Sequence, residues 1–146
     1  IGLVWLIDKI GESEADHDDV VEQTADELAS ATPDNATVYA DHLPNRDFPN
    51  PESSKVGDDH IPDVVVTSGA ANSLAIEVET KSSLDDESEA AESQLEDFAK
   101  RGYRRVLVVP DDAVDESVVS EFEERLNEEV NGTVHVETPS TVASLL

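Results

Sequence analysis

The chain of 146 residues is long enough for one domain with a modest hydrophobic core. It carries 35 acidic and 9 basic residues, a net charge of −26, and no cysteine, which excludes disulfides, thiolate metal sites and cysteine nucleophiles. Its longest apolar run, residues 3–7, is too short to span a bilayer and lacks the basic flank of a signal peptide, so we expect no membrane association.

The acidic residues are spread along the whole chain between periodic apolar runs, so we expect a folded domain with a charged surface. Only four of the basic residues are lysines, and an acid-rich, lysine-poor surface is typical of proteins from high-salt cytoplasms. At molar salt the screening length falls to about 3 Å, which removes most of the repulsion between the acids. We therefore expect a cytoplasmic protein of a halophile, archaeal or viral, whose acidity reflects its solvent rather than its partners.

The predicted elements alternate between helices and strands. A helix begins at Ser13, with Asp16 three residues on as a variant of the capping box, and residues 32–35 end it. The hydrophobic periodicity predicts strands at 37–40, 63–67, 74–81, 105–109 and 133–136, and further helices at 85–101, 115–129 and 140–146. The order α-β-β-β-α-β-α-β predicts an α/β fold with a mixed central sheet flanked by helices.

The chain begins at Ile1 and contains no methionine. We therefore interpret residues 1–12 as the tail of an upstream region and residues 13–146 as the domain.

Paired carboxylates are predicted where two of the strands form a hairpin. If residues 63–67 and 74–81 pair about the turn at 68–73, Asp63 lies opposite Val78 and within a residue of Glu79. Opposed Cβ atoms across such a ladder are about 4.5–5.5 Å apart. Two carboxylates at that separation repel unless a cation joins them, and oxygen ligands select Mg²⁺ or Mn²⁺. Lys81, on the face of Glu79, could hold a water or stabilise charge on a phosphate, so the group predicts phosphodiester hydrolysis.

The same residues resemble the signature of a known family. Pro62-Asp63 followed by Glu79-Thr80-Lys81 resembles the motif of the PD-(D/E)xK nucleases, and Lys81 is the only lysine with an acid two positions before it. Gln94 to Phe98 resembles the Q-x-x-x-Y motif of the RecB-like branch, with phenylalanine in place of tyrosine. The resemblance covers roughly residues 13–109 and implies a restriction-endonuclease-like core. It implies a Mg²⁺-dependent endonuclease or deoxyribonuclease that acts on DNA in repair, recombination or restriction.

The resemblance also implies roles for individual residues. Asp63 and Glu79 would hold the metal ion, with the carbonyl of Thr80 as a third ligand. Lys81 would position or activate a water, and Gln94 would orient Lys81 or the scissile phosphate.

Three further residues are candidates for the same site. Glu77 shares a face with Glu79 and Lys81, so it could be the metal ligand while Glu79 replaces the usual lysine; we favour Glu79 with Lys81. In the family an acid on the first helix often completes the metal site, and Glu14 and His17 lie at the start of that helix. A surface or packing role for His17 is the competing interpretation.

The few basic residues cluster at the end of the second predicted helix and the start of the next strand: Lys100, Arg101, Arg104 and Arg105. They fit a patch that contacts DNA phosphates and fit equally well cations that stabilise a helix C-terminus. Because molar salt weakens phosphate contacts, DNA binding would depend on metal bridging, hydrogen bonds and shape, or on a homodimer or a partner domain.

Two alternatives to an active nuclease stay open. One is a catalytically inactive nuclease-like domain that binds nucleic acid or protein. The other is an unrelated α/β domain in which Asp63 and Glu79 point apart.

Overall fold

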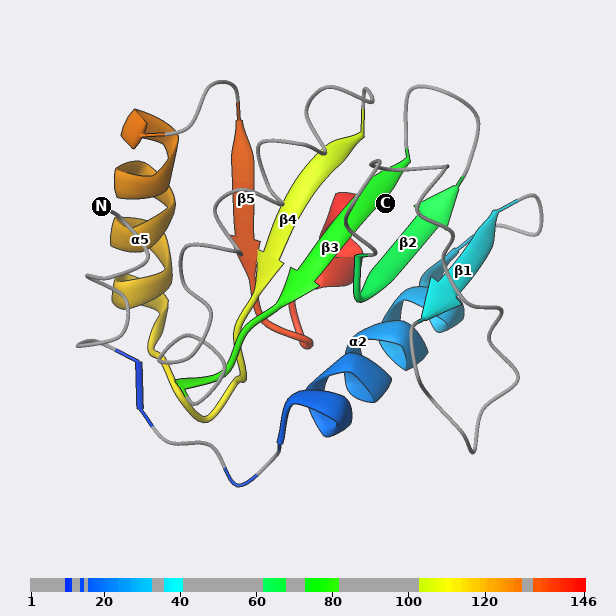
Figure 1. The fold of residues 1–146 in the computed structure, drawn as a ribbon, viewed down its shortest axis with the longest axis horizontal. Coiled ribbons are helices and arrows are strands. Elements are labelled where there is room, and N and C mark those ends of the chain that lie inside the picture. The colour runs from blue at the N-terminus through cyan, green and yellow to red at the C-terminus, as the bar shows by residue number, and fades with distance from the viewer. Residues whose placement is uncertain are drawn as a thin grey trace.

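The computed structural model describes residues 10–11, 14, 16–32, 36–40, 62–67, 73–81, 103–129 and 133–146. Figure 1 shows its elements, which are α2 (His17–Ala31), β1 (Thr37–Ala40), β2 (Val64–Thr67), β3 (Leu74–Val78), β4 (Arg104–Val108), α5 (Glu116–Glu129), β5 (Val134–Glu137) and the 3₁₀ helix η1 (Val142–Leu145). The helix predicted at 85–101 lies outside the described residues, and so does Gln94 within it. Among the described helices, none combines the length and apolar composition that crossing a membrane requires.

The five strands stand side by side in sequence order, β1-β2-β3-β4-β5. β1, β2 and β3 form an antiparallel meander, whereas β4 and β5 run parallel to β3. The predicted α/β class with a mixed sheet is therefore confirmed.

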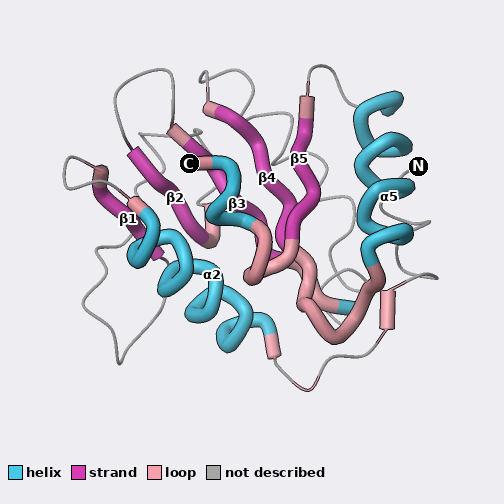
Figure 2. The backbone as a smooth tube through the Cα atoms, turned by 180° about the vertical axis from the view of Figure 1, so that it is seen from behind, coloured by secondary structure: helices cyan, strands magenta, loops and turns pink. Residues whose placement is uncertain are grey.

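The two faces of the sheet carry separate apolar clusters, each completed by one helix. One cluster joins α2 to the sheet and includes Leu28 and Ile76, while the other includes Leu107 together with Phe122 and Leu126 of α5. Figure 2 shows α2 on the side of β1 and β2, with α5 beside β5. Every residue of β3 is buried, because both faces of this central strand are covered.

The first helix begins later than predicted, because Asp16 rather than Ser13 is its N-cap. The Asp16 carboxylate accepts the N–H of Asp19 at 2.9 Å, and the Asp19 carboxylate accepts the N–H of Asp16 at 3.3 Å. This reciprocal pair is a capping box with Asp19 at the position that glutamate usually takes. So many acids occur near residue 16 that the sequence offers several caps at similar spacing.

The hairpin register differs from the prediction by one residue. Val64 pairs with Ile76, so extending the ladder places Asp63 opposite Glu77 instead of Val78. β3 also ends at Val78, before the predicted limit at Lys81. Apolar residues on both faces of these strands leave little pattern to distinguish one register from the next, which is why sequence periodicity missed it.

The remaining predicted boundaries lie within one or two residues of the observed ones. The last predicted helix, at 140–146, is a 3₁₀ helix of four residues.

Two described residues of the segment predicted to precede the domain, Ile10 and Gly11, pack against it. The Ile10 side chain is only 2% exposed, and the N–H of Gly11 donates to the carbonyl oxygen of Ala113 at 2.7 Å. A Cβ at Gly11 would lie 3.2 Å from that oxygen, so the close approach of the two chains favours glycine. The packed unit therefore includes at least residues 10–11.

The outer edge of β5 is bonded by side chains from α5. The Asn127 side chain accepts the N–H of Val134 at 2.7 Å and donates to its carbonyl oxygen at 3.2 Å. One turn earlier, Glu123 accepts the N–H of Val136 at 3.0 Å. The helix thus supplies hydrogen bonds that a further strand would otherwise make.

Candidate functional site

Asp63 joins three elements at one end of the sheet. It lies in a bend just before β2, and its Oδ2 accepts the N–H of Val78 at the end of β3, at 2.8 Å. The same oxygen lies 3.3 Å from Nε2 of His17, the first residue of α2. The exposed fraction of the side chain is 17% for Asp63 and 37% for His17. The pair therefore sits in a partly water-excluded corner where charges interact more strongly than in bulk water.

His17 is positively charged in this arrangement. The hydrogen bond with Asp63 raises the pKa of His17 to about 9, and the charges of Asp63 and Glu79 and a hydrogen bond with Asp18 act in the same direction, while burial opposes them. At neutral pH both ring nitrogens therefore carry protons, and Nδ1 donates to Asp18 Oδ1 at 3.3 Å. Because the charge of Glu79 acts on His17, this glutamate lies on the same side of the molecule as the pair.

Glu77 and Glu79 are both buried, each with 5% exposure. Side chains alternate along a strand, so both extend from the face of Ala75, opposite to that of Ile76 and Val78. The N–H of Glu79 donates to the carbonyl oxygen of Val108 at 2.9 Å, which continues the pairing with β4 past the end of β3. Two buried glutamates and Asp63 therefore occupy the ends of adjacent strands.

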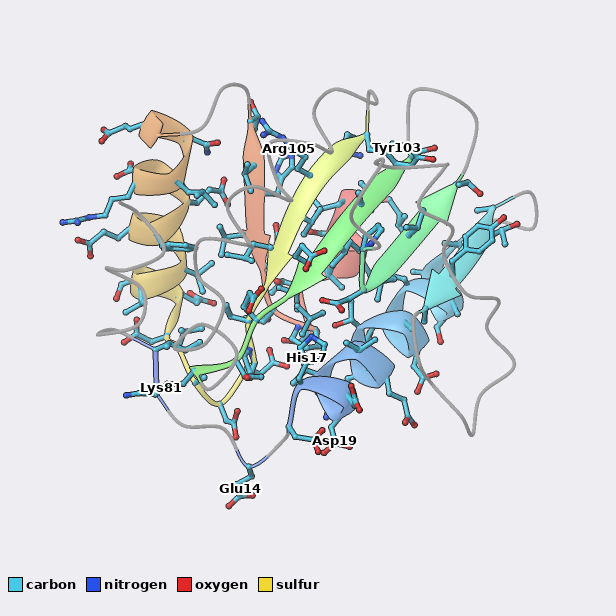
Figure 3. The ribbon with its side chains drawn as sticks, viewed as in Figure 1. Glu14, His17, Asp19, Lys81, Tyr103 and Arg105 are labelled. Carbon is cyan, nitrogen blue, oxygen red and sulfur yellow. The ribbon has the colours of Figure 1, made fainter. Side chains whose placement is uncertain are left out.

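Lys81 does not approach His17. Thr80 is buried and Lys81 is half-buried, directly after the two glutamates. Figure 3 shows the Lys81 side chain pointing away from His17. The structure thus brings Asp63, His17 and the end of β3 together, with the lysine of the signature turned outward.

Glu14 also lies apart from the pair. Its N–H donates to Asp112 Oδ2 at 3.1 Å, and its exposed side chain points away from the sheet in Figure 3. Of the two residues expected near the start of the first helix, only His17 contacts Asp63.

The predicted basic patch is not continuous over its described part. Arg104 Nη1 donates to the carbonyl oxygen of Leu145 at 2.8 Å, whereas the Arg105 side chain is only 2% exposed. As neighbours in β4, the two arginines extend from opposite faces of the sheet. Lys100 and Arg101 lie outside the described residues.

The donor chemistry of the Asp63 corner fits a hard cation. Carboxylate oxygens are the ligands that Mg²⁺ prefers, and this ion is usually held by one or two carboxylates plus water and phosphate oxygens. Within the described part of the chain, no three acidic or histidine side chains are close enough to form a metal-binding group. Asp63, Glu77 and Glu79 are the carboxylates of this corner that could hold such an ion.

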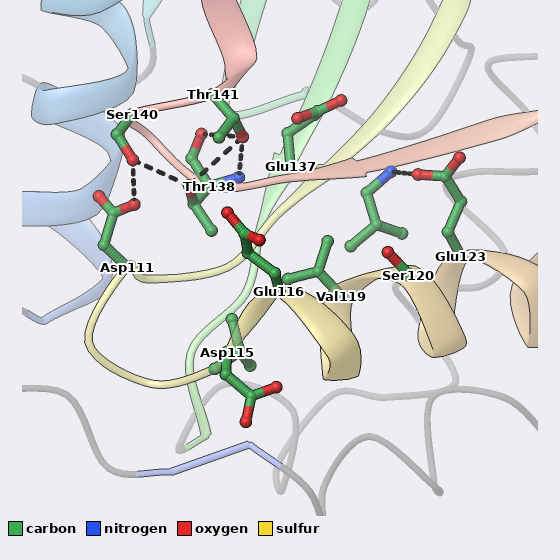
Figure 4. A pocket seen from close by; sticks show the side chains of 12 residues that line it. Asp111, Asp115, Glu116, Val119, Ser120, Glu123, Glu137, Thr138, Ser140 and Thr141 are labelled. Carbon is green, nitrogen blue, oxygen red and sulfur yellow. Dashed lines mark hydrogen bonds between the residues drawn. The ribbon is translucent and has the colours of Figure 1, made fainter.

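A separate cavity of about 430 Å³ opens between the start of α5 and the turn after β5, and its described lining includes Glu116, Glu137 and Ser140 (Figure 4). Ser140 Oγ donates to the carboxylate of Asp111 across its rim. The described lining contains five carboxylates and no basic side chain, and none of the site residues predicted from the sequence lies in it. We therefore place the candidate site at Asp63.

The sequence identified Asp63 but left His17 as one candidate among several. The sequence feature that could have singled out His17 is its position directly after the N-cap Asp16, because the first residue of a helix can lie beside the end of a neighbouring strand.

Comparison of the chain with protein-family models, curated proteins and solved structures found no match.

Proposed function

We propose that the chain is a metal-dependent nuclease domain that hydrolyses DNA phosphodiester bonds, in repair, recombination or restriction. The observation that carries the proposal is the hydrogen bond between Asp63, just before β2, and the N–H of Val78 at the end of β3, which Glu77 and Glu79 flank. The order of a helix, a hairpin and a further strand also supports it, because the resemblance to the PD-(D/E)xK nucleases implies a core with these elements.

Asp63 and either Glu77 or Glu79 would hold Mg²⁺ or Mn²⁺, with the carbonyl of Thr80 as a further ligand. When bound, such an ion neutralises charge on the phosphate and lowers the pKa of a coordinated water. The register favours Glu77, which extends the ladder opposite Asp63. The effect of Glu79 on the pKa of His17 favours Glu79. Both glutamates are therefore kept as ligands to be separated by mutation.

Lys81 and Gln94 would act on the water and the phosphate. The Lys81 side chain points away from His17 in the structure. In the proposed complex its amino group would have to turn toward Asp63. An ammonium group there would stabilise negative charge that develops during attack on the phosphate. Gln94 would hold Lys81 or the phosphate in place.

The test is cleavage of circular, linear and single-stranded DNA in molar KCl, with and without Mg²⁺. We expect cleavage that requires Mg²⁺ and is lost in Asp63→Asn and Lys81→Ala. Of Glu77→Gln and Glu79→Gln, the variant that loses more activity identifies the ligand. Glu124→Gln, on the exposed surface of α5, is the matched control and should cleave normally. Absence of Mg²⁺-dependent cleavage of all three substrates by the folded wild type would refute the proposal.

The second candidate is a catalytically inactive nuclease-like domain that binds nucleic acid or protein. Two observations favour it: Lys81 points away from His17, and Asp63 already holds the His17 ring. Such a domain would bind DNA without a metal and would not cleave it, which a fluorescence-anisotropy titration in KCl distinguishes from the enzyme. A homodimer or a partner domain would supply the phosphate contacts in either case.

A further inference from the structure

Both donors that reach the Asp63 carboxylate converge on one of its two oxygens. Oδ2 accepts the Val78 N–H at 2.8 Å and lies 3.3 Å from Nε2 of His17. No donor among the described residues bonds Oδ1. Among the described residues, the carboxylate is therefore held through Oδ2 alone.

The His17 ring is itself fixed at both ends. Nε2 lies 3.3 Å from Asp63 Oδ2, and Nδ1 lies 3.3 Å from Asp18 Oδ1. The backbone of His17 is fixed as well, because it follows the N-cap Asp16, which is locked by the capping box with Asp19. A ring held in this way can set the orientation of a neighbouring carboxylate.

We propose that His17 is a positioning residue that holds Oδ2 of Asp63 and so presents Oδ1 to the cation of the active site. The inference rests on the proposed function, because it assigns Asp63 as a ligand. It gives His17 a role outside the coordination sphere, where it acts through Asp63. The Val78 N–H holds the same oxygen from the main chain, and His17 prevents rotation of the carboxylate about the Cβ–Cγ bond.

Removing a residue that orients a ligand commonly weakens metal affinity 10- to 100-fold. We expect a loss of about that size for Mn²⁺ in His17→Ala. Glutamine has an amide nitrogen at a similar reach and can donate the same hydrogen bond. His17→Gln should therefore bind Mn²⁺ about as tightly as the wild type, because the donor to Asp63 is kept.

The experiment is calorimetric titration of Mn²⁺ into the DNA-free protein in molar KCl, so the readout does not depend on cleavage. Four variants are compared with the wild type: His17→Ala, His17→Gln, Asp63→Asn and the exposed control Glu27→Gln. Thermal melting of each variant shows that it is folded at the titration temperature. If His17→Ala does not fold, His17→Phe, which fills the ring space without a donor, takes its place.

Weaker binding in His17→Ala with recovery in His17→Gln supports the positioning role. Equal binding by wild type and His17→Ala overturns it while leaving the metal site intact. Equal loss in both His17 variants also overturns it, because the donor is then not the property that matters. If the wild type binds no Mn²⁺, or Asp63→Asn binds as well as the wild type, the assignment of Asp63 as a ligand fails.

Discussion

Asn127→Ala tests how α5 is held against the edge of the sheet. The change removes the two hydrogen bonds to the main chain of Val134, at 2.7 and 3.2 Å. Each is worth about 1 kcal/mol of net stability. The higher helix propensity of alanine offsets about 0.6 kcal/mol of this loss in stability. The expected net loss is about 1.5 kcal/mol in the free energy of unfolding, or roughly 3–6 °C in melting temperature for a domain of this size.

Urea unfolding in molar KCl, followed by circular dichroism, measures this loss. Glu128→Ala is the matched control, because the residue is exposed on the same helix and neighbours Asn127. That variant should change stability by no more than about 0.5 kcal/mol. A loss below 0.5 kcal/mol in Asn127→Ala would show that water replaces the side chain at the edge and would refute the reasoning.

Three further changes test other parts of the fold. The pKa of His17 is raised from an ordinary 6.5 to about 9 in the folded protein. After allowance for solvent screening, this shift contributes about 1–2 kcal/mol to the free energy of unfolding. The contribution is complete below pH 6.5 and is lost as the pH rises through 9. Urea midpoints between pH 6 and 10 should show this slope in the wild type and not in His17→Gln. Asp16→Ala removes the N-cap of α2 and should cost about 1 kcal/mol by the same measurement, and a loss near zero would mean that Asp16 is not the cap. Phe122→Ala empties a fully buried position and should cost about 3–5 kcal/mol, whereas a cost below 1 would place Phe122 outside the core.

The sequence predicted the elements of the described sheet because each has a local signal. Val64–Thr67 is a β-branched run, Thr37–Ala40 combines β-branched and aromatic residues, and Glu116–Glu129 shows a helical stripe of apolar residues. The start of the first helix is hard to predict where acids are abundant, because both Ser13 and Asp16 are residues that favour the N-cap position. Tertiary contacts escaped prediction: nothing local indicates that Asn127 bonds the edge of β5 or that Ile10 enters the core.

In the candidate site, too, local features could be predicted from the sequence and tertiary contacts could not. Asp63 stood out from sequence, because a proline and an acid precede an apolar strand. Its partners depend on the hairpin register and on where α2 begins, and both are set by tertiary packing. A helix that begins at Ser13 would carry His17 into its second turn, whereas the observed cap at Asp16 makes it the first helical residue, within reach of Asp63.

The hairpin register determines which of the two glutamates lies opposite Asp63. With Asp63 opposite Val78, Glu77 and Glu79 would be equally displaced from it along the strand. The observed pairing of Val64 with Ile76 places Glu77 opposite Asp63 and moves Glu79 two residues along, beyond the last residue of β3. Residues two apart on one face are about 6.6–6.8 Å apart along a strand, so the carboxylate of Glu79 has further to reach toward Asp63 than that of Glu77. If the cation lies between Asp63 and the directly opposed acid, Glu77→Gln abolishes Mn²⁺ binding and Glu79→Gln weakens it less.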